Sequence, residues 1–237
     1  MLEDAEVLDL GARPALETPT LVQALRDDGL MGIAMNALGL DPDVSVAALD
    51  LLPPVPLPAK IVCVDGGAWK AGNDDPDAVW TRFADTLVAP GGSFTVQREA
   101  AVSWRAGIAA VIGSCSRRVP PSHAHEMVAG YTCFADWATG GLSGGAAFGP
   151  WLLTPDEFLG AVGAEFSARV NGRTVGRYSV QPLVERLWEL LAHCSSWTTL
   201  EPGDVVAVLA PDVAAVESGD ICEIELPRVG VLVNDVL

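Results

Sequence analysis

The chain has few basic residues for its length. Its 237 residues include 14 lysines and arginines against 31 aspartates and glutamates, which gives a formal net charge of −17. A charge of this sign repels the phosphate backbone of nucleic acids and anionic lipid surfaces. We therefore expect neither nucleic acid nor a membrane as a partner, and solubility alone is a sufficient reason for the acidity.

The sequence also lacks a long apolar run. No stretch approaches the roughly 20 apolar residues that a membrane-spanning helix needs. The first ten residues, MLEDAEVLDL, are acidic where a secretory signal would be basic and then apolar. We expect a cytoplasmic protein.

Metal-binding and disulfide patterns are missing too. The five cysteines have no Cys-x-x-Cys spacing, so we expect reduced thiols that are mostly buried. His123, His125 and Glu126 are close in sequence, but helix positions two apart point in different directions and cannot easily share one ion. We interpret that segment as a surface helix.

What the sequence does contain changes in character near residue 55. The segment from Thr18 to Leu30 has an N-cap residue followed by apolar residues at helical spacing, and Asp41–Ala48 forms a second short element. Four prolines between Leu51 and Lys60 then forbid a helix and indicate an extended linker. We predict a small N-terminal domain over residues 1–55 and a main domain over residues 56–237.

Short β-branched runs separated by glycine and proline dominate the main domain. The clearest helix is Gln181–Cys194, which has one apolar face. Strands outnumber helices without strict alternation, so we predict the α+β class. The glycine-rich stretch from Gly140 to Gly149 is interpreted as a flexible loop.

Several blocks occur in a fixed order, and together they are more specific than any one of them. They are KIVCV at Lys60, AVIG at Ala110, VAGYTCFAD at Val128, FGPWLLT at Phe148, RVNGRTV at Arg169, TLEPGDVVAV at Thr199, SGDICEIEL at Ser218 and VGVLVNDV at Val229. From about residue 56 to the C-terminus this order resembles the fumarylacetoacetate hydrolase family. The resemblance implies a mixed β-roll or β-sandwich core with few helices, a small N-terminal domain and a homodimer.

Members of this family bind Mg²⁺ or a similar ion through a Glu-x-Glu pair and a downstream aspartate. The matching positions here are Arg105, Gly107 and Asp136, so only the aspartate is present. An ion pair between Asp136 and Arg105 is a better interpretation than a metal site. We therefore predict no metal cofactor. Calorimetric titration would reveal the alternative, a misaligned metal enzyme that uses Glu99 or Glu126.

Other parts of the family's site are also missing. The lid segment with its histidine matches Gly67 to Ala71, where Trp69 and Lys70 stand, and the lysine of the following segment matches Arg82. The loop that carries a second lysine and aspartate is shortened, and the Thr-Gly-Thr-Pro turn matches Val208 to Pro211. Because the metal normally stabilises an enolate, its loss removes the main source of transition-state stabilisation.

Two sets of candidate site residues follow from the match. The proposed catalytic set has Asp136 as base or orienting group, cations to receive negative charge, and an aspartate at a strand end that serves as a base if desolvated: Asp136, Arg105, Arg82, Lys70 and Asp65. The proposed substrate-binding set is Trp69, Trp104, Trp137, Tyr131 and Leu209. Trp80 belongs with the tryptophans of the pocket segments, which either stack on a ligand or refill space that metal and substrate have vacated.

Two functions from different classes remain. One is a metal-independent isomerase, cyclase, dehydratase or C–C lyase acting on a dicarbonyl or enolisable substrate such as a 2-oxo acid or a polyketide-like molecule. The other is a catalytically inactive paralogue that binds a small molecule or joins an active relative in a hetero-oligomer. Co-purification and the behaviour of Asp136 and Arg105 variants discriminate between them.

Overall fold

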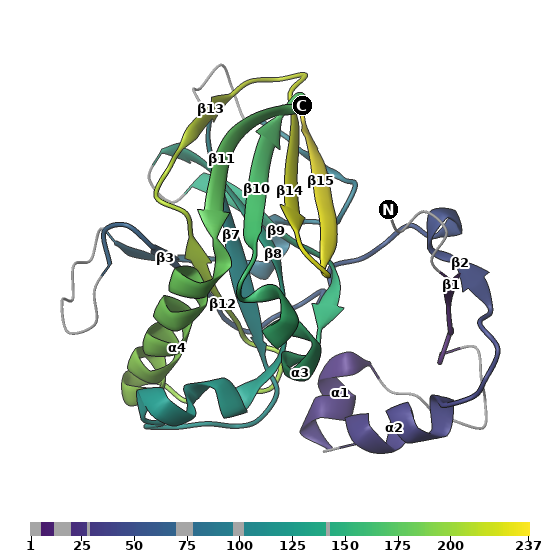
Figure 1. Cartoon of the computed structure of the whole chain (residues 1–237). Helices are drawn as coiled ribbons and strands as arrows, with labels where there is room; N and C mark the ends of the chain where they lie inside the picture. Colours follow the sequence, from purple (N-terminus) through teal and green to yellow (C-terminus); the bar gives the residue numbers. More distant parts are fainter. Residues whose placement is uncertain (1–5, 12–19, 28, 70–77, 97–101, 141–142) are drawn as a thin grey trace.

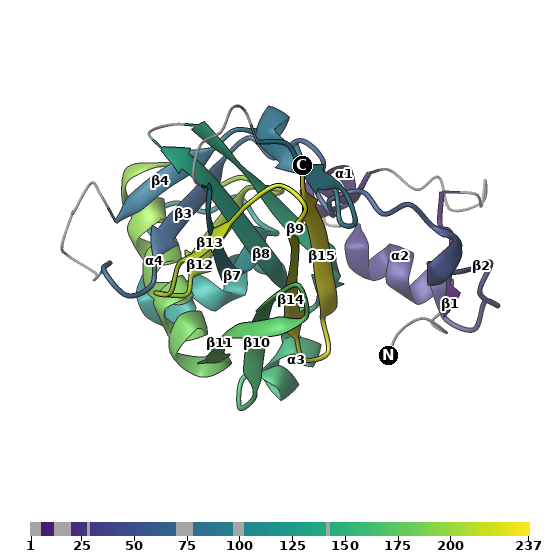
Figure 2. The same cartoon turned by 90° about the horizontal axis from the view of Figure 1, so that it is seen from above.

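The computed structural model describes residues 6–11, 20–27, 29–69, 78–96, 102–140 and 143–237. Two mixed sheets form the body of the molecule (Figures 1 and 2). The larger, eight-stranded sheet has the order β4 (Val79–Arg82), β3 (Ile61–Asp65), β12 (Val205–Leu209), β7 (Val102–Ile112), β8 (Val128–Gly140), β9 (Ser143–Leu153) and β5 (Leu87–Val88), with β13 (Ala214–Val216) paired to β7. The smaller sheet has the order β11 (Arg173–Ser179), β10 (Glu165–Val170), β14 (Ile221–Leu226), β15 (Gly230–Val236) and β6 (Ser93–Phe94).

Alternation along the central strands divides the core in two. In β7, Ile108, Ala110 and Ile112 join the main cluster between the sheets and helix α4 (Val180–Trp197). Ala109 and Val111 join a second cluster on the opposite face, together with Val55 of the proline-rich linker. Both faces of β7 are therefore covered. This explains why its sequence from Ala106 to Ile112 is a continuous apolar run and not an alternating one.

The predicted helix of the main domain is confirmed as α4. Its buried side chains include Leu183, Leu187 and Leu191 at helical spacing, and they face the main core cluster. The short helix α3 (Pro155–Phe158) follows β9. The predicted surface helix with His123 and His125 is present as a 3-10 helix over Pro121–Met127, and the His125 ring lies 5.6 Å from that of Trp188.

The N-terminal segment lies to one side of the two sheets (Figure 1). It contains α1 (Leu21–Arg26), α2 (Leu30–Ala37) and the two-residue strands β1 (Glu6–Val7) and β2 (Val44–Ser45). The Thr20 hydroxyl accepts a bond from the Gln23 amide and caps α1. Leu21 and Val22 pack against the second core cluster. The domain boundary at residue 55 stays a prediction.

The loop predicted over Gly140–Gly149 is wrong. Strand β9 begins at Ser143 and pairs antiparallel with β8 through Gly144, Gly145 and Ala146. The glycines are required by close approach, because a Cβ at Gly145 would lie 2.9 Å from the Phe94 ring and one at Gly144 would collide with the Trp137 carbonyl oxygen. Composition alone does not separate a glycine needed for flexibility from one needed for tight packing.

The cysteines have the state expected from the sequence. All five are free, and four of them are buried, while Cys115 is exposed. Within the described ranges we find no helix long and apolar enough to cross a membrane.

Candidate functional site

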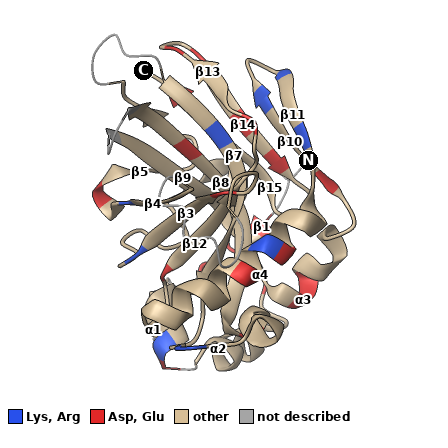
Figure 3. Ribbon diagram, turned by 90° about the vertical axis from the view of Figure 1, so that its left-hand side faces the viewer, with Lys and Arg blue, Asp and Glu red and all other residues tan. Residues whose placement is uncertain are grey.

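Four strands of the large sheet bring the predicted charged residues to one region. Asp65 ends β3 and Arg82 ends β4, while Arg105 on β7 lies directly opposite Asp136 on β8 in the register. In Figure 3 the strands of the large sheet are mostly uncharged, and the blue segment on β7 is Arg105. The charged residues of this region therefore lie on strands that are otherwise mostly uncharged.

Arg82 and Asp136 form a two-bond ion pair. Arg82 Nε lies 2.7 Å from Asp136 Oδ1, and Arg82 Nη2 lies 3.0 Å from Oδ2. Both residues are buried, with exposed fractions of 8% and 3%. Arg82 Nη2 also donates to the Trp137 carbonyl oxygen at 3.3 Å. Planar two-point pairing of this kind is a property of arginine that lysine cannot reproduce.

Asp136 is surrounded by opposing electrostatic influences. Burial raises the pKa of its carboxyl group, while the hydrogen bonds and charge of Arg82, the Trp80 indole and the charge of Arg105 act in the lowering direction. Burial also raises the pKa of the neighbouring Cys63 thiol, and the Asp136 charge adds to that increase. Cys63 is therefore a neutral thiol and not a nucleophile.

Trp80 connects this pair to a second one. Its Nε1 donates to Asp136 Oδ1 at 3.3 Å, and its ring lies 5.5 Å beneath the Arg105 guanidinium. Arg105 Nη1 in turn donates to Asp65 Oδ2 at 2.8 Å. The four charged residues and Trp80 form one chain of contacts, which we call the charge cluster: Arg82, Asp136, Trp80, Arg105 and Asp65.

The expected ion pair between Asp136 and Arg105 is therefore wrong, because the partner of Asp136 is Arg82. Arg82 binds both Asp136 oxygens, and Arg105 turns toward Asp65 and the face of Trp80. Asp65 is itself held in place, because its Oδ1 accepts the amides of Gly67 and Ala68 at the end of β3. The pair of Asp65 and Arg105 is the more accessible one, with side-chain exposures of 19% and 26%.

The residues at this site do not suit a divalent cation. A hard cation takes several carboxylate or carbonyl oxygens. Here a guanidinium occupies both oxygens of Asp136, and the facing residue on β7, Arg105, is a cation and not a carboxylate. Among the described residues we find no group of three or more histidine, cysteine, aspartate or glutamate side chains that could hold an ion.

Two glycines near the charge cluster leave no space for a side chain at their positions. Gly107 pairs with Leu209 of β12, and a Cβ there would collide with the Val208 carbonyl oxygen. A Cβ at Gly144 would lie 3.0 Å from Arg82 Nη2. A glutamate at position 107 would therefore require β12 to shift.

The predicted aromatic substrate-binding residues lie away from the charge cluster. Trp104 and Trp137 are register partners on β7 and β8, and alternation directs both into the main core cluster on the opposite face from Arg105 and Asp136. Trp137 stacks on Phe94 at 5.4 Å. Trp69 is fully buried beside His193 of α4, and its carbonyl oxygen accepts a bond from Arg186.

The remaining predicted residues have mixed positions. The Tyr131 hydroxyl accepts a bond from Trp188 Nε1 at 2.9 Å, its ring stacks on Phe158, and it is buried in the core. Leu209 packs in the second core cluster, although its carbonyl oxygen accepts the Gly66 amide beside Asp65. Lys70 and Glu99 lie outside the described residues. Glu126 lies in the 3-10 helix.

Trp80 is the residue of this site that the candidate sets leave out. The sequence groups it with three other tryptophans, yet within the described residues Trp80 is the tryptophan whose side chain contacts Asp136 and Arg105. The alternation of side chains along β4 would have predicted that Trp80 and Arg82 share a face. Trp80 pairs with Cys63, and Arg82 pairs with Ile61, so both project on the face of the second core cluster.

This α+β fold carries its charge cluster on one face of the large sheet, with two arginines and two aspartates paired to each other. Residues 67–237 match the family model described as fumarylacetoacetate (FAA) hydrolase, C-terminal. The chain belongs to the fumarylacetoacetate hydrolase family.

Three proteins illustrate what this chain is similar to. The mitochondrial oxaloacetate tautomerase of Rattus norvegicus is 26% identical over 264 residues, covering 98% of this chain and 84% of that protein. Maleylpyruvate hydrolase from Sphingobium sp. SYK-6, solved in complex with manganese(II) and pyruvate, is 25% identical with a TM-score of 0.78, covering 96% and 89% of the two chains. The 5-carboxymethyl-2-hydroxymuconate delta-isomerase of Mycobacterium smegmatis is 24% identical with a TM-score of 0.72, covering 84% and 86%, and that likeness shows the fold alone.

Proposed function

We propose that this chain is a metal-independent isomerase or lyase of the family that acts on a small enolisable 2-oxo acid at the accessible end of the charge cluster. The observation that carries the proposal is the position of Arg105, in contact with Asp65 and facing Trp80, where the family resemblance implies a metal-binding glutamate. Oxaloacetate and pyruvate, named for two similar proteins, are both 2-oxo acids.

The roles of the two arginines differ in this proposal. Arg82 is committed to the buried Asp136 and holds it in place. Within the described part of the chain Arg105 makes one side-chain hydrogen bond, to Asp65, so its remaining N–H groups can receive the carboxylate or the developing enolate oxygen of a substrate. A guanidinium supplies part of the charge that a divalent ion would supply.

Proton transfer falls to Asp65 in this scheme, because Asp136 is buried against Arg82, whereas the Asp65 side chain is 19% exposed. In a keto–enol interconversion Asp65 would take a proton from the carbon next to the carbonyl group and return it to the same carbon in the reverse direction. The oxygen gains its proton from solvent while Arg105 bonds to it, and Asp65 releases the proton it took to solvent before the next turnover. Cyclisation and dehydration begin from the same enolate, and C–C cleavage releases one.

The test is the keto–enol interconversion of oxaloacetate, followed by ultraviolet absorbance in the presence of a chelator. We expect activity that survives chelation, and a loss of at least about tenfold for both Arg105→Ala and Asp65→Asn, within the usual contribution of a general base. Arg169→Gln is the matched control, because Arg169 forms its ion pairs with Glu223 and Glu225 on the other sheet. Turnover that is unchanged in both site variants contradicts the proposal.

The burial of Asp136 favours a second candidate, an inactive paralogue. A carboxylate that is 3% exposed and bonded through both oxygens can act as structure without acting in chemistry. In this version the chain binds a small molecule or assembles with an active relative in a hetero-oligomer, whereas the enzyme version is a homodimer. Co-expression with an intact family member, purification through a tag on one chain and mass analysis of the complex separate the two assemblies.

A further inference from the structure

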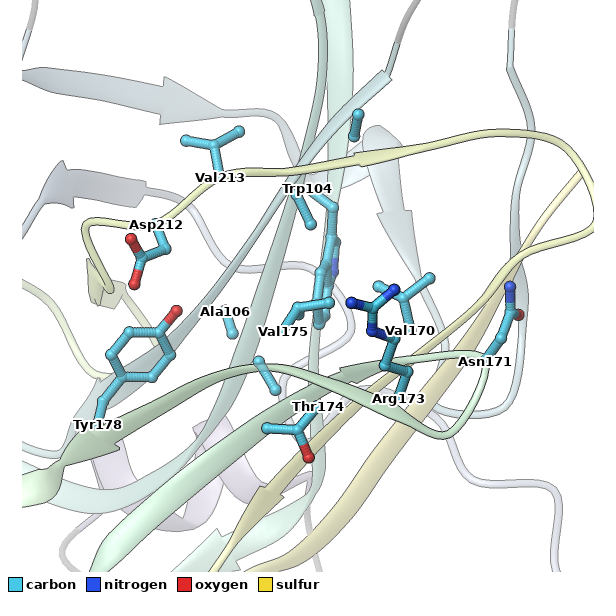
Figure 4. Close-up of a pocket in the computed structure, with 13 residues that line it drawn as sticks. Trp104, Ala106, Val170, Asn171, Arg173, Thr174, Val175, Tyr178, Asp212 and Val213 are labelled. Carbon is cyan, nitrogen blue, oxygen red and sulfur yellow. The ribbon is translucent and has the colours of Figure 1, made fainter.

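A cavity of about 770 Å³ lies on the other face of the large sheet from the charge cluster. Its floor is Trp104 and Ala106 of β7, one wall is the β10–β11 hairpin, and the segment around Asp212 and Val213 closes over it (Figure 4). Arg105 lies between the two floor residues in sequence and points to the opposite face. The sheet itself therefore separates this cavity from the charge cluster.

The floor contains a buried hydrogen-bond donor that has no acceptor. The Trp104 side chain is 1% exposed, and its Nε1 has no hydrogen-bond partner within the part of the chain that the structure describes. Figure 4 shows the indole standing between Val175 and Val170 in the cavity. Buried indole N–H groups usually have a partner, and an unpaired one costs stability. An acceptor supplied by a ligand would satisfy it.

The charged and polar groups around the cavity lie on two sides of the indole. Arg173 and Asn171 are on one side and Tyr178 and Asp212 on the other, with the Tyr178 phenol facing the Asp212 carboxylate (Figure 4). No ion pair of Arg173 is found among the described residues, whereas Arg169 of the same sheet is paired with Glu223 and Glu225. Arg173 is thus the cation available to an anionic ligand.

The wall with Tyr178 depends on a glycine. A Cβ at Gly176 would collide with the Tyr178 phenol, so the absence of a side chain at this position of β11 lets the ring fold back along the strand. Burial and the facing Asp212 carboxylate raise the pKa of Tyr178 to about 12, so the phenol is neutral at any physiological pH. Apart from Thr174, the rest of the lining is apolar, from alanine and valine side chains.

We propose that this cavity is a second small-molecule site, built for a flat, mostly apolar carboxylic acid. The carboxylate would lie at Arg173, an acceptor oxygen would take the Trp104 indole N–H, and the apolar body would cover Ala106 and Val170. The indole and the arginine suit this chemistry because a carboxylate has acceptors only, and the alanine and valine lining matches an aromatic or polyene body.

The test uses trans-cinnamate as probe and cinnamyl alcohol as its uncharged analogue. In protein labelled with ¹⁵N, the Trp104 indole resonance is assigned by its disappearance in Trp104→Phe. We expect cinnamate to shift this resonance in a saturable manner and cinnamyl alcohol to bind at least tenfold more weakly. Calorimetry gives the affinities of the variants.

The variants separate the site from general charge effects. Arg173→Gln should weaken cinnamate at least tenfold, while Arg177→Gln, which removes an exposed arginine of the same strand outside the cavity lining, should leave the affinity within twofold. Gly176→Val should also weaken binding by displacing the Tyr178 ring. Equal losses in the two arginine variants would overturn the proposal. So would a Trp104 resonance that does not respond to cinnamate, including the case in which a second copy of the chain covers the cavity.

Discussion

Arg82 binds both carboxylate oxygens of Asp136 from a position 54 residues away in the chain. The pair joins β4, at the edge of the large sheet, to β8 near its centre, across the three strands β3, β12 and β7. Such a contact links the first strands of the main domain to its middle. Because both side chains are buried, the desolvation of each charge is offset only while its partner is present.

Arg82→Met should therefore destabilise the protein strongly. Removing one partner of a buried ion pair leaves an uncompensated charge, which typically costs about 3–5 kcal/mol. The double variant Arg82→Met with Asp136→Leu removes both charges and should recover most of that loss. Urea unfolding of the three variants gives the coupling energy. Arg169→Met is the control, and we expect a loss of about 1 kcal/mol or less because its partners are more exposed.

Gly144→Ala should disturb the same pair from the opposite strand. The new methyl group would press on the Trp137 carbonyl oxygen and would lie 3.0 Å from Arg82 Nη2, and overpacking of this kind costs about 1–3 kcal/mol. Gly163→Ala is the matched control, because a Cβ at Gly163 meets nothing within 4 Å. Equal midpoints for the two variants would mean that β9 can move away from Arg82.

The sequence predicted the fold around the charge cluster better than the side-chain contacts within the cluster. The ordered blocks predicted the α+β roll, and the apolar spacing of Leu183, Leu187 and Leu191 predicted α4, because both signals are local. The partner of Asp136 was not predictable in this way. Arg82 and Arg105 are both close enough in the fold, and the choice between them depends on the three-dimensional contacts of Asp65 and Trp80.

The glycines gave a misleading signal for a related reason. Gly144 and Gly145 resemble a flexible loop by composition, yet each is fixed by an atom that a side chain would strike. Strand parity would have separated Trp104 from Arg105, since adjacent residues face opposite sides. The aromatic set as a whole required the structure, because stacking on a ligand and packing in a core use the same side chain.

Titration with Mn²⁺ should give no tight stoichiometric binding at this site. The guanidinium of Arg82 occupies Asp136, and no second carboxylate stands at position 107. Arg105→Glu with Gly107→Glu should not restore a metal site and should lower stability, because a side chain at position 107 collides with β12. Calorimetry on the native protein is the measurement. One tightly bound ion per chain would show that the ligands come from elsewhere.

The thiols should divide into one reactive group and four protected ones. Cys115 is exposed, whereas Cys63, Cys133, Cys194 and Cys222 are buried, and burial raises the pKa of Cys133, Cys194 and Cys222 to about 12. A thiol-reactive chromophore should therefore label one cysteine in the native protein and all five after denaturation. Cys115→Ser should abolish the native reaction. A second fast thiol would contradict the core described here.

Alkaline titration should show both tyrosines ionising late. Burial raises the pKa of Tyr131, and burial with the Asp212 carboxylate raises that of Tyr178 to about 12, against about 10 for an unfolded tyrosine. An acid whose folded pKa is raised contributes stability that is fully present below the unfolded pKa and is lost as the pH rises through the folded value. The folded protein should thus lose stability between about pH 10 and 12. Tyrosinate absorbance of the native protein, compared with the denatured chain and with Tyr178→Phe, measures each phenol, and ionisation of Tyr178 near pH 10 would show that Asp212 does not face it.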